Sequence, residues 1–170
     1  MIRNREPARL RETRKATKED AAAVANLFRT TFAATYPHFA KLHTPEEDLA
    51  HFQKVLQSNH TVIVEKDGEI AGFCAFTPGW VNYLYVLPKY QGSGIGSRLL
   101  NEAKSENAAL QLWTFQENKK ARNFYERHGF KPVEETDGAG NEEKQPDVRY
   151  VWERVPKTAK EFRLSVWAIA

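Results

Sequence analysis

The stretch Val86-Leu87-Pro88-Lys89-Tyr90-Gln91-Gly92-Ser93-Gly94-Ile95-Gly96-Ser97-Arg98-Leu99-Leu100 joins a predicted strand to a predicted helix through a glycine-rich turn. The apolar, β-branched and aromatic run from Val81 to Val86 predicts the strand, and Pro88 ends it because proline cannot donate to a ladder. Leu99, Leu100 and Ala103 follow at helical spacing. Such a turn directs several backbone N–H groups one way at a helix N-terminus, and it therefore predicts a phosphate or pyrophosphate site.

The order of residues in this turn differs from two common phosphate-binding loops. A P-loop places Lys and then Ser or Thr after its last glycine, whereas Ser97 and Arg98 follow Gly96 here. The dinucleotide fingerprint Gly-x-Gly-x-x-Gly would need a third glycine at Ser97 or Leu99. The sequence instead reads Gln-x-x-Gly-x-Gly from Gln91 to Gly96, and taken alone it leaves a tight turn without a ligand as the alternative.

A second block lies farther along the chain. The run from Leu110 to Phe115 predicts a strand, and Asn118 then opens a helix that ends before Gly129. Ala121, Phe124, Tyr125 and His128 fall on one face of that helix, and Phe130 begins the next strand.

The two blocks together resemble the GCN5-related N-acetyltransferases. Gln91 to Gly96, preceded by Val-x-Pro, resembles the coenzyme A loop of that family, and Asn118 to Phe130 looks like its second conserved block. The resemblance runs from about Arg11 to Arg154 and is weak before Thr61. It implies an α+β fold over residues 1–155, with a mixed, mostly antiparallel central sheet flanked by helices on both faces.

Local signals place the remaining elements. In chain order we first expect an edge strand from Leu10 to Ala16, a helix capped by Thr17 with Asp20, and a helix capped by Thr44 with Pro45 and Glu47. A hairpin of Thr61–Glu65 and Glu69–Phe76 follows around Lys66-Asp67-Gly68, and the last strands are Phe130–Glu134 and Val148–Val155. The tail of residues 156–170 has no counterpart in the resemblance, and we expect either an interface peptide, which would make a homodimer, or a disordered end.

Composition narrows the class of protein. The chain of 170 residues has the size of one domain, and its formal charge of +3 is too small to argue for nucleic acid binding. No run approaches the ~20 apolar residues of a membrane span, and the first residues do not resemble a signal peptide. The single cysteine, Cys74, lies in an apolar run, which favours a buried thiol, no metal set and a reducing, cytoplasmic compartment.

The resemblance implies transfer of an acetyl group from acetyl-CoA to a primary amine within a ternary complex, without a metal. The backbone N–H groups from Gly92 to Ser97 would hold the pyrophosphate, the strand backbone would align with the pantetheine arm, and one strand N–H would face the thioester oxygen. The implied coenzyme-binding residues are Leu84, Tyr85, Val86, Gln91, Gly92, Ser93, Gly94, Ile95, Gly96, Ser97 and Asn118.

Tyr125 matches the tyrosine that in this family lies near the thioester sulfur. A phenol stays protonated at neutral pH and can donate to a departing thiolate, so Tyr125 is the expected general acid, with a core aromatic as the alternative. Asn118 matches an asparagine that contacts the coenzyme arm, and it also fits a helix N-cap.

The sequence departs from the family at the general base. Many relatives carry a Glu on the fourth or fifth strand, where this chain has Trp80, Asn82 and Trp113. We therefore name no base: the proton could pass through water to Glu117, Glu135 or the acidic loop, or be lost in bulk solvent. The two tryptophans suit either an aromatic wall for the acceptor or plain packing.

The charges of one loop suggest which class of acceptor the protein would bind. In this family the loop from Glu135 to Asp147 borders the acceptor side, and its carboxylates at Glu135, Asp137, Glu142 and Glu143 would attract a cationic amine, unless they form only a solvated surface. Tyr36, His38 and His43 lie in a loop expected to flank the acceptor. The alternatives to acetyl transfer are transfer of a longer acyl group and a non-catalytic acyl-CoA sensor or partner-binding module on the same fold.

Overall fold

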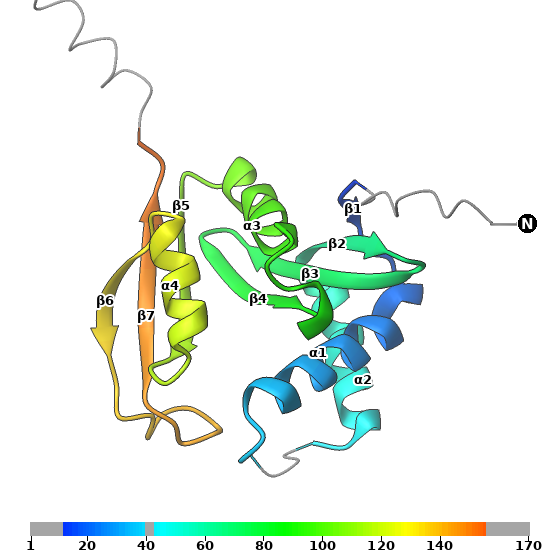
Figure 1. Ribbon diagram of the computed structural model, residues 1–170, viewed down its shortest axis with the longest axis horizontal. Coiled ribbons are helices and arrows are strands. Elements are labelled where there is room, and N and C mark those ends of the chain that lie inside the picture. Colours follow the sequence, from blue (N-terminus) through cyan, green and yellow to red (C-terminus); the bar gives the residue numbers. More distant parts are fainter. Residues whose placement is uncertain (1–11, 40–42, 156–170) are drawn as a thin grey trace, which may run out of the picture.

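The computed structural model describes residues 12–39 and 43–155 of the chain. The elements follow the predicted order (Figure 1). They are β1 (Arg14–Lys15), η1 (Lys18–Asp20), α1 (Ala21–Thr35), α2 (Pro45–Ser58), β2 (His60–Lys66), β3 (Glu69–Thr77), β4 (Trp80–Val86), η2 (Pro88–Tyr90), α3 (Ile95–Glu106), β5 (Ala109–Phe115), α4 (Lys119–Arg127), β6 (Lys131–Glu135) and β7 (Asp147–Glu153). The tail of residues 156–170, for which we expected an interface peptide or a disordered end, lies outside the described residues.

The described strands form one sheet in the order β1-β2-β3-β4-β5-β7-β6. Five of the six neighbouring pairs are antiparallel, and β4 with β5 is the parallel pair. Within the described part of the chain, β4 and β5 are paired only where Trp80 lies opposite Gln111. The two strands diverge beyond that point, so the sheet separates into a β1–β4 part and a β5–β7 part (Figure 1).

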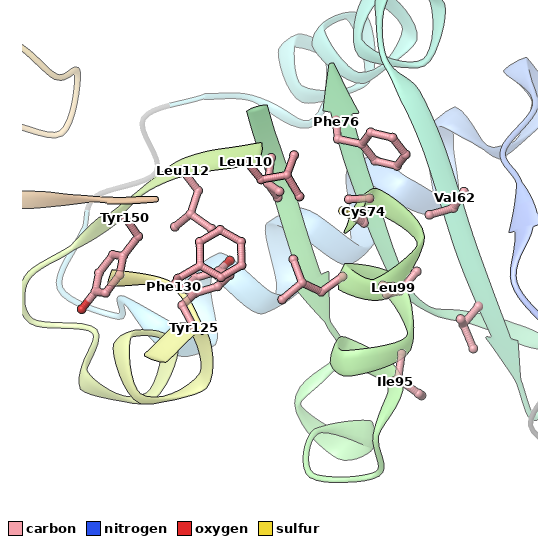
Figure 2. Close-up of a cluster of buried hydrophobic side chains, with 14 of the residues drawn as sticks. Val62, Cys74, Phe76, Ile95, Leu99, Leu110, Leu112, Tyr125, Phe130 and Tyr150 are labelled. Atoms are coloured by element: carbon pink, nitrogen blue, oxygen red, sulfur yellow. The ribbon is translucent and has the colours of Figure 1, made fainter. Parts of the chain in front are cut away.

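Helices cover both faces of the sheet, as predicted. On one face α1 and α2 pack Val24 and Phe52 against Phe73 of β3. On the other face α3 packs Leu99 against β3 beside Cys74 (Figure 2). A Cβ at Gly72 of β3 would lie 3.0 Å from the Leu99 side chain, so glycine allows this close approach of helix to sheet.

Several predicted start and turn signals are present. The Thr44 hydroxyl accepts from the Glu47 N–H (3.2 Å) and the Glu47 carboxylate accepts from the Thr44 N–H (2.8 Å), which is the expected capping box of α2. In the β2–β3 hairpin Asp67 and Gly68 have φ of 54° and 83°, as a two-residue turn requires. Near Thr17 the chain first forms the short turn η1, and α1 begins only at Ala21.

The predicted edge strand at Leu10–Ala16 is shorter than expected. Within the described residues it is limited to Arg14 and Lys15, which pair with Ile63 and Val62. Charged side chains give β1 little apolar surface to bury, so pairing with β2 alone defines it. No described helix is long and apolar enough to cross a membrane.

Candidate active site

A cavity of about 1160 Å³ lies where β4 and β5 diverge. Its wall combines α1, α2 and β4 with the glycine loop, α4 and the loop between β6 and β7. This volume is that of a site for an extended ligand rather than for a single small molecule. The cavity thus places the two sequence blocks on the same wall.

The backbone of β4 has one free edge in this cavity. The N–H of Leu87 donates to the carbonyl of Ala71 in the direction of β3 (2.9 Å). Since backbone groups alternate along a strand, those of Leu84 and Val86 face the opposite edge, which β5 has left. The Val86 carbonyl there accepts from the side-chain amide of Gln91 (2.9 Å). A ligand with its own amides could add to this edge as a strand does.

The glycine loop presents backbone donors at the start of α3. Gly92 and Gly94 have φ of 77° and 84°, and nothing lies within 4 Å of a Cβ built on either. The N–H of Arg98 makes the first helical bond, to the Gly94 carbonyl (3.1 Å). The N–H groups from Ile95 to Ser97 therefore have no helical acceptor, and donors of this kind at the positive end of a helix dipole favour an anion.

Side chains of α4 complete the same end of the cavity. A Cβ at Gly96 would lie 3.3 Å from the Phe124 ring, so glycine there lets α3 start against α4. His128 donates through Nδ1 to the Phe124 carbonyl (2.7 Å), and its Nε2 lies 2.9 Å from the Ser97 hydroxyl. Lys120 adds a positive charge and donates to the Gln91 side-chain carbonyl (2.5 Å).

Tyr125 lies on the cavity wall with its ring in the core. Its side chain packs against Phe130 at 5.6 Å between ring centroids, and Figure 2 shows the two residues near Leu112 of β5. Burial raises the pKa of Tyr125 well above its ordinary value, so the hydroxyl stays protonated. Among the described residues, none hydrogen-bonds that hydroxyl, and its proton is available to a ligand.

Asn118 has the predicted capping role and a second contact. Its side-chain oxygen accepts from the Ala121 N–H (3.0 Å), and its amide nitrogen donates to the Tyr36 hydroxyl (2.7 Å). Tyr36 is buried on the cavity wall, and this burial raises its pKa. The contact joins the end of α1 to the start of α4 across the cavity.

The other end of the cavity is rich in charged and aromatic groups. The Tyr83 hydroxyl of β4 lies 2.7 Å from His51 Nε2 of α2. Arg29 of α1 pairs with the buried Asp48 of α2 at 2.5 Å. Further lining residues at this end are Phe28, His43, Glu47, Lys54, Asn82, Trp113, Glu142, Glu143 and Asp147.

The loop from Thr136 to Asp147 is folded tightly on itself. Asn141 donates to the Gln145 carbonyl (2.7 Å) and to the Asp147 carboxylate (3.1 Å). A Cβ at Gly138 would lie 2.2 Å from the Gln145 backbone, so only glycine fits there. The loop therefore presents its acidic tip as a fixed surface.

The four carboxylates proposed for the acceptor side separate into two pairs. Glu142 and Glu143 line the cavity, as expected, and Glu142 lies 3.2 Å from His43 Nε2. Glu135 and Asp137 do not line it: Glu135 lies 3.7 Å from Arg122, and Asp137 accepts from the Ala139 N–H (2.9 Å). That the charges of these two residues attract a cationic acceptor stays a prediction.

The two tryptophans, for which either an aromatic wall or plain packing was expected, lie in different places. Trp113 lines the cavity, is 41% exposed and has the Arg149 guanidinium 5.9 Å from its ring centroid. Trp80 is not part of the lining, because it lies at the end of β4 that is still paired with β5. Glu117, considered as a proton acceptor, lies 3.3 Å from His38 beside a neighbouring pocket of about 440 Å³.

Most residues predicted from the sequence meet in the one cavity. Ser93 and Ile95 are not among its lining residues: the Ser93 hydroxyl donates to the Tyr90 carbonyl (2.5 Å), and the Ile95 side chain is core. The predicted residues that line the cavity are Leu84, Tyr85, Val86, Gln91, Gly92, Gly94, Gly96, Ser97, Asn118 and Tyr125.

Sequence reasoning missed the contact of His51 with Tyr83, which joins residues far apart in the chain. It also gave His128 no role beyond its helix face. His51 and Tyr83 stand in no local motif, and His128 lies in the second block only as a residue of the helix face, so no signal in the sequence marked their contacts.

Comparisons with known proteins agree with this geometry. Residues 57–132 match the family model of the acetyltransferase (GNAT) domain. The uncharacterized N-acetyltransferase YhfO of Bacillus subtilis is 33% identical over 135 residues, which are 69% of this chain and 87% of that protein. An uncharacterized N-acetyltransferase of Archaeoglobus fulgidus is 26% identical over 150 residues, 77% of this chain and 99% of its own.

Solved structures show the same fold at lower identity. A GCN5-related N-acetyltransferase from Rhodopseudomonas palustris superposes with a TM-score of 0.72 at 20% identity, covering 89% of this chain and 100% of its own. The PaiA N-acetyltransferase from Thermoplasma acidophilum was solved in complex with coenzyme A. It superposes with a TM-score of 0.62 at 22% identity, covering 84% of this chain and 98% of its own. The chain therefore belongs to the GCN5-related N-acetyltransferase (GNAT) family of acyl-CoA-dependent acetyltransferases.

Proposed function

We propose that this enzyme transfers an acetyl group from acetyl-CoA to the primary amine of a cationic acceptor, by direct attack in a ternary complex. The observation that carries the proposal is the single cavity, which joins an anion-binding loop, a free strand edge and a protonated tyrosine to a cluster of carboxylates. The first three suit the coenzyme and the last suits a cation.

The residues on the donor side fit coenzyme A. N–H groups from Gly92 to Ser97 would hold the pyrophosphate, with Lys120 and Gln91 beside it. The free edge of β4 would hold the pantetheine arm, and one N–H of that edge would face the thioester oxygen. A donor aimed at a developing oxyanion is typically worth ~3 kcal/mol of barrier.

The reaction follows from these positions. A neutral amine attacks the thioester carbonyl, a C–N bond forms, and the C–S bond breaks as the tetrahedral intermediate collapses. Tyr125 protonates the departing sulfur, because burial keeps its hydroxyl protonated and no described residue occupies it. The proton that the nitrogen carries after attack replaces the one that Tyr125 gives up.

The charges at the other end of the cavity favour a cationic acceptor. Asp48 is already paired with Arg29. On the acidic loop, Asp147 accepts from Asn141 and Thr136, and Glu142 and Glu143 are the further carboxylates that the loop presents to the cavity. The relative YiaC of Escherichia coli is named a peptidyl-lysine N-acetyltransferase and is 34% identical over 71 residues, 41% of this chain and 49% of its own. A lysine side chain and a small diamine are therefore the first acceptors to test.

The test is a transfer assay with purified enzyme and acetyl-CoA. Thiol release and the mass of the product are measured with diaminobutane, Nα-acetyl-lysinamide, benzylamine and glycine as acceptors. We expect amide formation with at least one of the first two. Transfer should be slower to benzylamine, which has one positive charge where diaminobutane has two, and to glycine, whose carboxylate the acidic loop would repel. Absence of any acetylated amine, with acetyl-CoA binding intact, would overturn the proposal.

A further inference from the structure

His51 and Tyr83 form a hydrogen-bonded pair that the family resemblance does not account for. His51 Nε2 of α2 lies 2.7 Å from the Tyr83 hydroxyl of β4, and both residues line the acceptor end of the cavity. Tyr83 immediately precedes Leu84, whose backbone lies on the free edge of β4. The pair is thus adjacent to the strand edge at which the thioester would lie.

The Tyr83 ring is fixed by its neighbours. Phe52 lies 5.3 Å and Phe28 6.4 Å from it between ring centroids. Burial, and then the charge of Glu143, raise the pKa of Tyr83, so its hydroxyl is protonated at neutral pH. Tyr83 therefore cannot remove a proton alone, but it can accept one while it donates its own to a base.

His51 is the base in contact with that hydroxyl. Its side chain is exposed at the surface of α2, so an imidazolium formed there can lose its proton to water. The charged groups around it are Glu47, Asp48 and Lys54 on α2, Arg29 on α1, paired with Asp48, and Glu143 on the β6–β7 loop. Carboxylates stabilise an ammonium and so oppose its deprotonation, whereas an imidazole accepts a proton at neutral pH.

We propose that His51 takes the proton of the incoming ammonium through the Tyr83 hydroxyl, and that Glu143 holds the ammonium beforehand. The inference rests on the proposed function, and it supplies the base that the strand residues Trp80, Asn82 and Trp113 lack. Tyr83 touches the substrate amine, and His51 acts through Tyr83.

The protons balance in this scheme. One N–H bond of the ammonium breaks and an O–H bond forms at Tyr83, while the original O–H proton of Tyr83 moves to His51 Nε2. His51 then releases one proton to solvent, which is the one net proton of the overall reaction. The neutral amine that remains attacks the thioester, and Tyr125 protonates the sulfur as described above.

The experiment is a pH profile of kcat/KM for the amine, using diaminobutane or Nα-acetyl-lysinamide, whichever the wild type acetylates faster. The variants are His51→Gln and Tyr83→Phe, which keep most of the packing. His60→Gln is the matched control, because His60 of β2 is also a surface histidine bonded to a partner, Glu106 (2.8 Å), but lies outside the cavity lining. Acetyl-CoA binding is measured for each variant by calorimetry.

We expect the pH profile of the wild type to show an ascending limb that depends on His51. His51→Gln and Tyr83→Phe should lower kcat/KM about 10²-fold at neutral pH. Their ascending limb should move toward the pKa of the free amine, and much of the activity should return in alkaline solution. His60→Gln should match the wild type, and all variants should bind acetyl-CoA alike.

Two results would overturn the inference while leaving the proposed function in place. The first is a pH profile of His51→Gln whose ascending limb coincides with that of the wild type. The second is an equal loss at every pH, which would show that His51 only positions Tyr83. A wild type that acetylates no amine would instead remove the proposed function, and this inference with it.

Discussion

At the scale of single residues, Tyr125 combines two properties that core tyrosines rarely share. Its ring packs against Phe130, yet its hydroxyl opens on the cavity and has no partner among the described residues. Replacing Tyr125 by Phe removes the proton donor and keeps the ring. We expect turnover to fall ~10²-fold or more, with little change in acetyl-CoA affinity. Steady-state kinetics and calorimetry on the same preparation measure both quantities.

The control for this variant is Tyr150→Phe. Tyr150 is also a buried tyrosine of the same cluster, but its hydroxyl donates to Glu126 (2.7 Å), and it is not part of the cavity lining. Its loss should affect thermal stability rather than turnover. Full activity of Tyr125→Phe, under conditions where chemistry limits the rate, would mean that another group protonates the sulfur.

The residue scale also shows what sequence can and cannot predict. Tyr125 and Asn118 were predictable because they stand in a motif with fixed spacing. The pair of His51 and Tyr83 was not, since it depends on how α2 lies over β4. No local pattern reports a contact between two elements that only the folded sheet brings together.

At the scale of elements, the glycine loop owes its shape to positive φ. Gly94→Val would place a branched side chain in the open space above the N–H groups and strain a φ of 84°. We expect acetyl-CoA to bind at least about tenfold more weakly, which corresponds to about 1.4 kcal/mol. Calorimetry measures the affinity, and thermal unfolding measures the accompanying strain.

Gly68→Val separates these two effects. Gly68 of the β2–β3 hairpin has a φ of 83° and equally open surroundings, but it lies outside the cavity lining. It should lower stability to a similar degree and leave coenzyme affinity unchanged. Equal affinities in the two variants would mean that the loop does not hold the pyrophosphate.

The loop between β6 and β7 also depends on a glycine, Gly138, for its shape. A Cβ at Gly138 would overlap the Gln145 backbone, so Gly138→Ala must displace the loop that carries Glu142 and Glu143. We expect a higher KM for the amine and an unchanged KM for acetyl-CoA. Gly140→Ala is the control, because nothing lies within 4 Å of a Cβ there. If both variants keep the wild-type KM for the amine, the position of the loop does not matter for the acceptor.

Element types were largely predictable, and their ends less so. The α2 helix carries Thr44, Pro45 and Glu47 in the order that a helix start requires, and it begins where expected. The Thr17 start gave a short η1 turn before α1, because the Asp20 N–H donates to the Thr17 carbonyl three residues back (3.0 Å), which is the bond of a tighter turn. Competing local hydrogen bonds of this kind are not visible as a pattern of apolar residues.

At the scale of the whole molecule, the parting of β4 from β5 creates the site. The sequence predicts both strands, but nothing in either one indicates that their pairing stops at Trp80 and Gln111. The bulge in β4 near Asn82 and the helices on opposite faces set that geometry together. For this reason the order of the elements could be predicted, whereas the position of Trp80 outside the cavity lining could not.

The charge distribution is also a property of the whole molecule. The chain carries a formal net charge of +3, yet the acidic loop turns Glu142 and Glu143 toward one end of the cavity while the anion-binding loop lies at the other. A cationic amine and the coenzyme polyanion would thus be drawn to opposite ends. Attraction over such distances is screened by salt, with a Debye length of about 8 Å at physiological ionic strength.

The double variant Glu142→Gln and Glu143→Gln tests this separation. We expect a higher KM for the amine, a KM for acetyl-CoA that hardly moves, and a difference from the wild type that shrinks as salt is added. A second double variant, Glu19→Gln with Glu153→Gln, changes the net charge equally at exposed positions outside the cavity lining, and it should behave as the wild type. If both double variants raise the KM equally, net charge rather than the acidic loop attracts the acceptor. If neither does, or if a neutral amine proves the better substrate, the acceptor is recognised by contacts other than charge.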